Sequence, residues 1–194
     1  MGLLVMIVGL VLFLGAHSFT TRRDLRARLI ASTGEGSYKM LYSLASLAGL
    51  VLIVWGFAHY RATGWIDVWS PPRALKHLNL ALMLPAVIFV VAAYIRGTIY
   101  VKLKHPMLAG VKLWAFGHLL ANGDLGGIIL FGSFLSWAVY DRISLKRRSD
   151  PGSPPIPVGG ITNDLIAVAV GFVAYLALAF VFHPVVIGVP VVGT

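Results

Sequence analysis

Residues 2–19 read GLLVMIVGLVLFLGAHSF, a run of 18 residues without an acidic, Lys or Arg side chain. A helix needs about 17–25 predominantly apolar residues to cross the hydrocarbon core of a bilayer. The run therefore predicts a transmembrane helix. It has no basic segment before it and no small-residue cleavage site after it, so we do not expect it to be a cleavable signal peptide.

The composition of the chain extends this prediction to the whole molecule. Of the 194 residues, 58% are hydrophobic and 12% are charged, against about 45–50% and about 25% in soluble domains. A soluble enzyme, a disordered chain and a disulfide scaffold are therefore excluded as classes. The absence of cysteine also removes thiolate catalysis and thiolate-bound metal clusters. We expect an all-α, polytopic membrane helix bundle that forms a single membrane domain over residues 1–194.

Five further apolar runs bring the expected number of transmembrane helices to about six. Those near 107–121 and 125–139 are short, and only Asn122-Gly123-Asp124 separates them; the others lie near 40–57, 78–95 and 165–186. The short pair predicts either two crossings or a re-entrant hairpin, and Asp124 is placed to cap the second helix. Residues 146–160, KRRSDPGSPPIPVGG, are typical of a linker.

Basic residues are distributed unevenly between the loops. Twelve of the 16 Lys and Arg residues fall in 20–39, 96–106 and 141–163, whereas the remaining loops hold three. Basic loops face the cytoplasm, so we expect a multi-pass protein of a bacterial inner membrane with both termini periplasmic. Membrane topology explains the net charge of +9 better than nucleic-acid binding does. Residues 22–30 are expected to lie along the anionic inner leaflet.

Six histidines are the polar residues most relevant to function. His59 and His183 fall at the expected outer ends of two helices, where an interfacial position explains them. His17 and His118 lie inside helices beside small residues, which leave room for a flat group or a second helix. Two histidines on different helices can hold a haem iron from opposite faces. The alternative is a pair of hydrogen-bonded histidines that pack helices together.

Depth in the membrane complicates a pairing of His17 with His118. At about 1.5 Å per residue, His118 lies roughly 20 Å along a helix that starts at His105, whereas His17 lies near the cytoplasmic face. If Lys112 extends its amine to that interface, His118 becomes shallow enough to pair with His17. Otherwise His17 pairs better with His105, and His118 with His77.

Residues 105–125, HPMLAGVKLWAFGHLLANGDL, resemble the hallmark of the NnrU family of bacterial membrane proteins. Supporting matches are found at 15–18, 38–44 and 131–132, and the resemblance covers about residues 1–148. It implies an inner-membrane protein linked to denitrification and nitrogen-oxide metabolism, with no firmly assigned reaction.

The chain is also similar to 15-cis-zeta-carotene isomerase, a membrane enzyme with b-type haem that isomerises a polyene when the iron is reduced. The haem ligands of that enzyme match His17 and His118, whereas its nearby cysteine matches Ala115. The resemblance implies haem b, with these two histidines as the metal ligands. It also implies a redox or isomerase-like role, a membrane redox partner and an apolar or polyene-like substrate. The remaining residues expected at the cofactor are His77, His105, Lys112 and Asn122.

Two alternatives stay open. His105-Pro106 followed by Gly110 resembles the His-Pro-x-x-x-Gly of membrane methyltransferases, which implies S-adenosylmethionine as the cofactor. Such enzymes use downstream acidic residues, and this chain offers Asp141, Asp150 and Asp164. The other alternative is a cofactor-free accessory or assembly protein that docks a partner helix.

Overall fold

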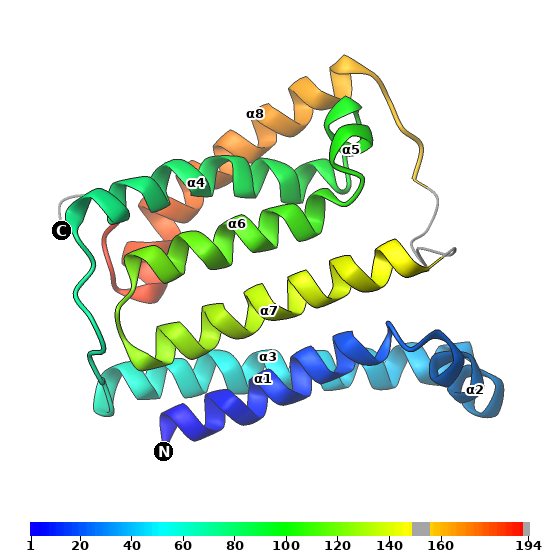
Figure 1. Ribbon diagram of the computed structural model, residues 1–194, viewed down its shortest axis with the longest axis horizontal. Coiled ribbons are helices and arrows are strands. Elements are labelled where there is room, and N and C mark those ends of the chain that lie inside the picture. The colour runs from blue at the N-terminus through cyan, green and yellow to red at the C-terminus, as the bar shows by residue number, and fades with distance from the viewer. Residues whose placement is uncertain (149–155, 192–194) are drawn as a thin grey trace. The chain divides into compact units, whose positions relative to one another are not determined.

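The computed structural model describes residues 1–148 and 156–191, and it confirms the expected all-α fold. Apart from one isolated β-bridge between Asp67 and Asp124, every regular element in these ranges is a helix. The helices are shown in Figure 1: α1 Gly2–Phe19, α2 Arg23–Thr33, α3 Glu35–Thr63, α4 Arg73–Ala92, α5 Thr98–Leu103, α6 Pro106–Ala121, α7 Leu125–Arg147, α8 Ile161–Ala177 and the π-helix η1 Leu178–Ile187.

The protein is a multi-pass membrane protein by the length and composition of its helices. Within the described ranges, five helical segments are long and apolar enough to cross a bilayer: α1, α3, α4, α7, and α8 continued by η1. Helix α6 has 16 residues, which agrees with the short run expected there. Helix α7 has 23 residues and is longer than expected, because the helix continues beyond its apolar run into a basic last turn that ends at Arg147. Part of the expected 146–160 linker, residues 149–155, lies outside the described residues.

The chain forms two compact units, and the first comprises Met1–Ser70 and Asn122–Arg147. Its centre is the pair α1 and α3, with α7 packed against α1. Glycines at a seven-residue spacing, Gly2 and Gly9 on α1 and Gly49 and Gly56 on α3, lie in the contact between the two backbones. Small residues let membrane helices approach closely, which explains why these helices pack over most of the length of α1.

Helix α2 contains most of the basic stretch at residues 22–30 and has no buried residue. It contacts α3, and the guanidinium of Arg26 lies 5.2 Å from the centre of the Tyr38 ring. Gly34 separates α2 from α3 with a φ of +83°, a conformation that glycine adopts without strain.

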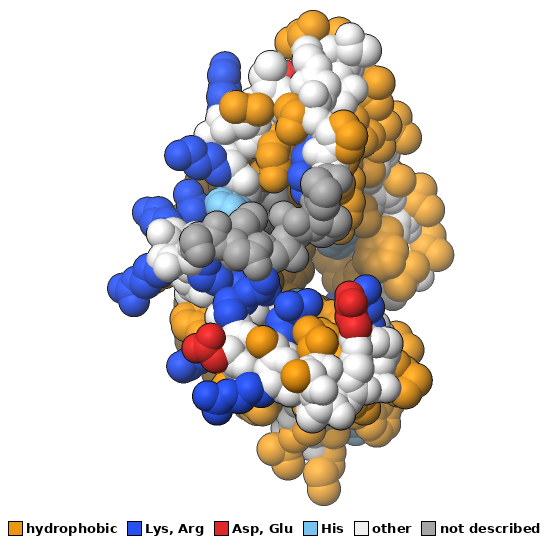
Figure 2. Space-filling model, turned by 90° about the vertical axis from the view of Figure 1, so that its right-hand side faces the viewer, with side chains coloured by type: hydrophobic (Ala, Val, Ile, Leu, Met, Phe, Trp, Pro, Cys, Tyr) orange, Lys and Arg blue, Asp and Glu red, His pale blue; other side chains and the backbone are white. Residues whose placement is uncertain are grey.

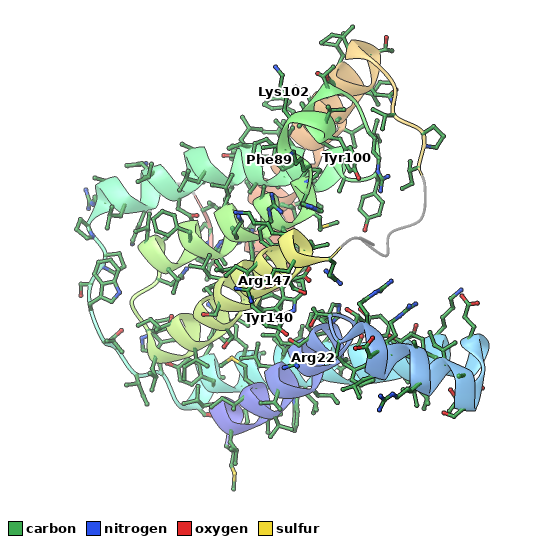
Figure 3. All side chains as sticks on the ribbon, turned by 45° about the vertical axis from the view of Figure 1, so that its right-hand side comes forward. Arg22, Phe89, Tyr100, Lys102, Tyr140 and Arg147 are labelled. Atoms are coloured by element: carbon green, nitrogen blue, oxygen red, sulfur yellow. The ribbon has the colours of Figure 1, made fainter. Side chains whose placement is uncertain are left out.

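In Figure 2, the face of the molecule in view carries more Lys and Arg than Asp and Glu side chains. In Figure 3, the basic residues Arg22 and Arg147 of this unit are labelled.

The second unit comprises Pro71–Ala121 and Arg148–Thr194. In it α4 packs against both α6 and α8. A methyl group on Gly110 of α6 would lie 2.6 Å from the carbonyl oxygen of Ala86, so this glycine is needed where α6 crosses α4. Helix α5, which carries Tyr100 and Lys102 (Figure 3), contacts α4, α6 and α8.

Arg96 and Asp164 connect the ends of the helices in the second unit. The Asp164 carboxylate accepts hydrogen bonds from the backbone N–H groups of Thr98 and Ile99, each 3.0 Å long, and from the Thr98 hydroxyl. The Arg96 guanidinium donates to the Ala93 carbonyl and lies 4.3 Å from the centre of the Tyr100 ring. The bonds to Asp164 satisfy the first amides of α5, which have no partner within the helix.

Candidate haem-ligating histidines

His17 lies in the last turn of α1, within the first unit. Its Nδ1 lies 2.7 Å from the carbonyl oxygen of Phe13, one turn earlier. In the neutral imidazole this bond places the proton on Nδ1 and the lone pair on Nε2. The position of the proton therefore suits metal ligation through Nε2.

Aromatic side chains from three helices of the first unit, α1, α3 and α7, lie around His17. The Phe13 ring is stacked on the imidazole at 4.2 Å between centres, Tyr42 of α3 lies at 5.3 Å, and Trp137 of α7 meets it edge-on at 5.7 Å. Three buried donors in the described part of this unit have no hydrogen-bond partner: the hydroxyls of Tyr38 and Ser46 and the Nε1–H of Trp137. Buried polar groups are usually satisfied, so this neighbourhood has hydrogen-bonding capacity that the protein itself does not use.

His118 lies three residues before the end of α6, within the second unit. Its Nδ1 lies 2.8 Å from the carbonyl oxygen of Trp114, so it repeats the arrangement seen at His17. The Trp114 ring is tilted against the imidazole at 5.5 Å between centres. Small residues precede His118: Ala115 is completely buried, and Gly117 packs against Asn79 and Met83 of α4.

His183 makes a contact with His118 that the sequence did not predict. It lies in η1, and its ring centre is 6.3 Å from that of His118, with 21° between the ring planes. Its Nδ1 lies 2.8 Å from the Leu178 carbonyl oxygen, five residues earlier. In the sequence, Pro184 indicates that the helix is irregular next to His183, because a proline inside a helix removes a backbone hydrogen bond.

The motif-bearing segment can now be placed on the fold. Residues 106–121 of the HPML…HLLANGD string form α6, and Asn122-Gly123-Asp124 form the turn into α7. The family model described as NnrU protein matches residues 5–191, nearly the whole chain. The chain belongs to the NnrU family. The match extends beyond the 1–148 region on which the resemblance was recognised, and so includes His183. Neither a curated protein nor a solved structure matches the chain.

The NnrU turn between α6 and α7 is structural. The Asp124 carboxylate, 1% exposed, accepts a hydrogen bond of 2.7 Å from the backbone N–H of Gly127. This confirms the expected cap of the helix that begins at Leu125. The Gly123 carbonyl accepts bonds from the amides of Val68 and Trp69, and the Leu125 amide donates to Ile66. The turn thereby holds the loop after α3 in the first unit.

The structure distributes the predicted cofactor residues over both units. Asn122 lies in the first unit with His17. His77 is exposed in the first turn of α4, His105 immediately precedes α6, and Lys112 lies in the middle of α6. No group of three or more His, Asp or Glu residues suited to a metal ion occurs in the described residues.

Proposed function

We propose that this NnrU-family protein binds haem b in the membrane through histidine, with His17 and His118 as the candidate axial ligands. The observation that supports the proposal most directly is that both imidazoles make the same kind of hydrogen bond to the backbone. Each Nδ1 is bonded to the carbonyl oxygen four residues earlier, at 2.7 and 2.8 Å. A metal-binding histidine typically donates its other ring N–H in this way, which fixes the tautomer and orients the ring.

The surroundings of His17 fit a flat, largely apolar group with polar edges. Phe13, Tyr42 and Trp137 provide aromatic contacts, and the unsatisfied Tyr38 hydroxyl and Trp137 Nε1–H are donors. Binding sites for cofactors are mostly apolar with a few placed polar groups. In the second unit, Ala115 is completely buried, Gly117 packs against Asn79 and Met83, and the Trp114 ring lies beside the His118 imidazole.

A haem held by imidazoles supplies one-electron redox chemistry. The protein would hold each imidazole in the orientation set by its carbonyl and exclude water with apolar helices. Ala115 occupies the position of the cysteine in the isomerase that the chain resembles, so histidine is the strong ligand type that this chain provides. A redox or redox-gated isomerase-like role, linked to nitrogen-oxide metabolism by the NnrU resemblance, agrees with these features.

The methyltransferase alternative has less support from the geometry. Asp164 is one of the acidic residues considered for gripping S-adenosylmethionine, and its carboxylate is occupied by Thr98 and Ile99. That carboxylate therefore has a structural role at the start of α5. Asp150 lies outside the described residues.

The test is the absorption spectrum of protein purified from haem-replete cells. We expect a Soret band that shifts when dithionite is added, and a weaker or altered band in His17→Ala and His118→Ala. His59→Ala is the matched control, because the Nδ1 of His59 contacts the Thr63 hydroxyl instead of a backbone carbonyl. A colourless wild-type protein would overturn the proposal and, if it co-purified with an oxidoreductase, would favour the accessory protein.

A further inference from the structure

The loop after α3 exposes large apolar side chains although it is not itself a membrane-spanning helix. Four of its residues, Trp65, Ile66, Val68 and Trp69, are between 38% and 56% exposed. Single exposed apolar residues are normal, whereas a contiguous group of them marks a surface that contacts something other than water. We call residues 65–69 the apolar loop. It lies entirely in the first unit, so its description does not depend on where the second unit lies.

Hydrogen bonds fix the backbone of the apolar loop against the start of α7. The amides of Val68 and Trp69 donate to the Gly123 carbonyl, at 2.8 and 3.0 Å. The Ile66 carbonyl accepts a bond of 2.9 Å from the Leu125 amide. The NnrU turn therefore holds the loop in one conformation, and in that conformation the large side chains are exposed.

The polar groups of the loop are also paired, which lowers the cost of removing the loop from water. The Ile66 amide donates to the hydroxyl of buried Tyr60, 3.1 Å away. The Trp65 Nε1–H donates to the Asp67 carboxylate at 2.7 Å, and the Trp65 ring is stacked on that of Tyr60 at 6.1 Å between centres. Backbone groups without a partner are costly in a membrane, and bonds of this kind remove that cost at four backbone groups of the loop.

The position of the loop indicates what covers it. Helix α3 is long and apolar enough to cross a bilayer, so its two ends lie at opposite membrane surfaces. At its first end the exposed side chains include the ion pair of Glu35 and Lys39, and at its other end they are those of the apolar loop. Tryptophan is enriched at the lipid–water interface, because its ring is apolar and its N–H is polar. The bilayer is therefore the occupant that this location supplies.

We infer that the apolar loop inserts its side chains into the lipid–water interface, and that the NnrU turn Asn122-Gly123-Asp124 positions it there. The partner of this surface is the bilayer itself, at the membrane face opposite the basic helix α2. Interfacial aromatic anchors help to set the tilt and rotation of membrane helices. The loop thereby orients α3 in the membrane. This inference goes beyond the proposed function and does not rest on haem binding.

The experiment measures the depth of a nitroxide label on Val68→Cys, which is possible because the natural chain contains no cysteine. The full-length variant is reconstituted into vesicles of phosphatidylcholine and phosphatidylglycerol. Electron paramagnetic resonance then compares relaxation of the label by oxygen, which concentrates in lipid, with relaxation by a nickel chelate dissolved in the water. Leu47→Cys, at an exposed position in the middle of α3, is the lipid reference, and a nitroxide free in the buffer is the water reference.

We expect the ratio of oxygen to nickel relaxation at position 68 to lie between the two references and to exceed that of the free nitroxide. A ratio equal to that of the free nitroxide would place the loop in water and overturn the inference. Protection from both reagents would also overturn it, because the loop would then be covered by protein, such as a second copy of the chain.

The role of the NnrU turn is tested by adding Asp124→Ala to Val68→Cys. Loss of the helix cap should loosen the turn, so the spectrum of the label should show greater mobility and its relaxation ratio should move toward that of the free nitroxide. Asp24→Ala, at an exposed position on α2, is the control and should change neither property. An unchanged label in Asp124→Ala would overturn the positioning role of the turn, and it would do so independently of the depth measured for the loop.

Discussion

Gly49 of α3 lies directly against Gly9 of α1, such that a methyl group on Gly49 would come within 3.0 Å of the Gly9 carbonyl oxygen. A methyl group on Gly9 would in turn lie 2.6 Å from the Ile53 amide nitrogen. Two backbones that approach this closely leave no volume for a side chain. The packing of α1 on α3, which forms the centre of the first unit, therefore depends on these two positions.

Gly9→Ala should destabilise the protein by about 1–3 kcal/mol, the usual cost of adding atoms to a well-packed contact. Thermal unfolding in detergent measures this loss as a lower transition temperature. Gly15→Ala is the matched control on the same helix, because a methyl group there meets nothing within 4 Å. An alanine in an open helical position should leave the stability unchanged or raise it by about 1 kcal/mol. Equal transition temperatures for the two variants would contradict the packing argument.

Asp124→Ala should cost about 1 kcal/mol of stability, within the 0.5–2 kcal/mol range for loss of a helix cap. The buried carboxylate accepts the Gly127 N–H at 2.7 Å, and alanine leaves that donor without a partner. Asp67→Ala is the control, because Asp67 is exposed and its carboxylate binds only the exposed Trp65 side chain among the bonds described. A change within about 0.5 kcal/mol is expected for the control. If both substitutions have the same effect, Asp124 does not act as a cap.

The sequence predicted the helices better than it predicted the contacts of their side chains. Apolar runs predicted all five helical segments of the described residues that are long and apolar enough to cross a bilayer, because this property depends on composition and length. The sixth expected segment, near 107–121, forms the shorter helix α6. The same information placed Asp124 at a helix start. The approach of His183 to His118 was not predictable in this way, since it depends on the rotational positions of η1 and α6. A π-helix changes that rotation without changing the hydropathy of the segment.

Histidines at both candidate positions were recognised from their small neighbours, but their pairing could not be derived. Sequence spacing gives the depth of a residue along its own helix, and the structure adds the ring directions. In both His17 and His118 the Nδ1 atom is bonded to a backbone carbonyl. No sequence pattern predicts this bond. The role of Asp164 was also missed, because its partners Thr98 and Ile99 lie more than 60 residues away.

Arg96→Ala should destabilise the protein by about 1.5–3 kcal/mol, a typical value for hydrogen bonds made by a charged group. The side chain is 9% exposed, donates to the carbonyls of Ala93 and Ile156 and lies over the Tyr100 ring. Arg96→Lys should recover only part of the loss, because an ammonium lacks the planar fork of donors. Arg73→Ala, at an exposed position on α4, is the control and should change the unfolding temperature little. Full recovery by lysine would show that charge alone matters at this position.

The predicted sidedness of the membrane can be tested with single cysteines, because the natural chain contains none and gives no background. Ser32 lies in the last turns of the basic helix α2, and Ser70 lies in the loop before α4; both are exposed. Basic loops face the cytoplasm, so Ser70→Cys should react with a membrane-impermeant thiol reagent added to cells with a permeable outer membrane. Ser32→Cys should react only after the inner membrane is opened. Reaction of Ser32→Cys in intact cells, with protection of Ser70→Cys, would reverse the assigned orientation.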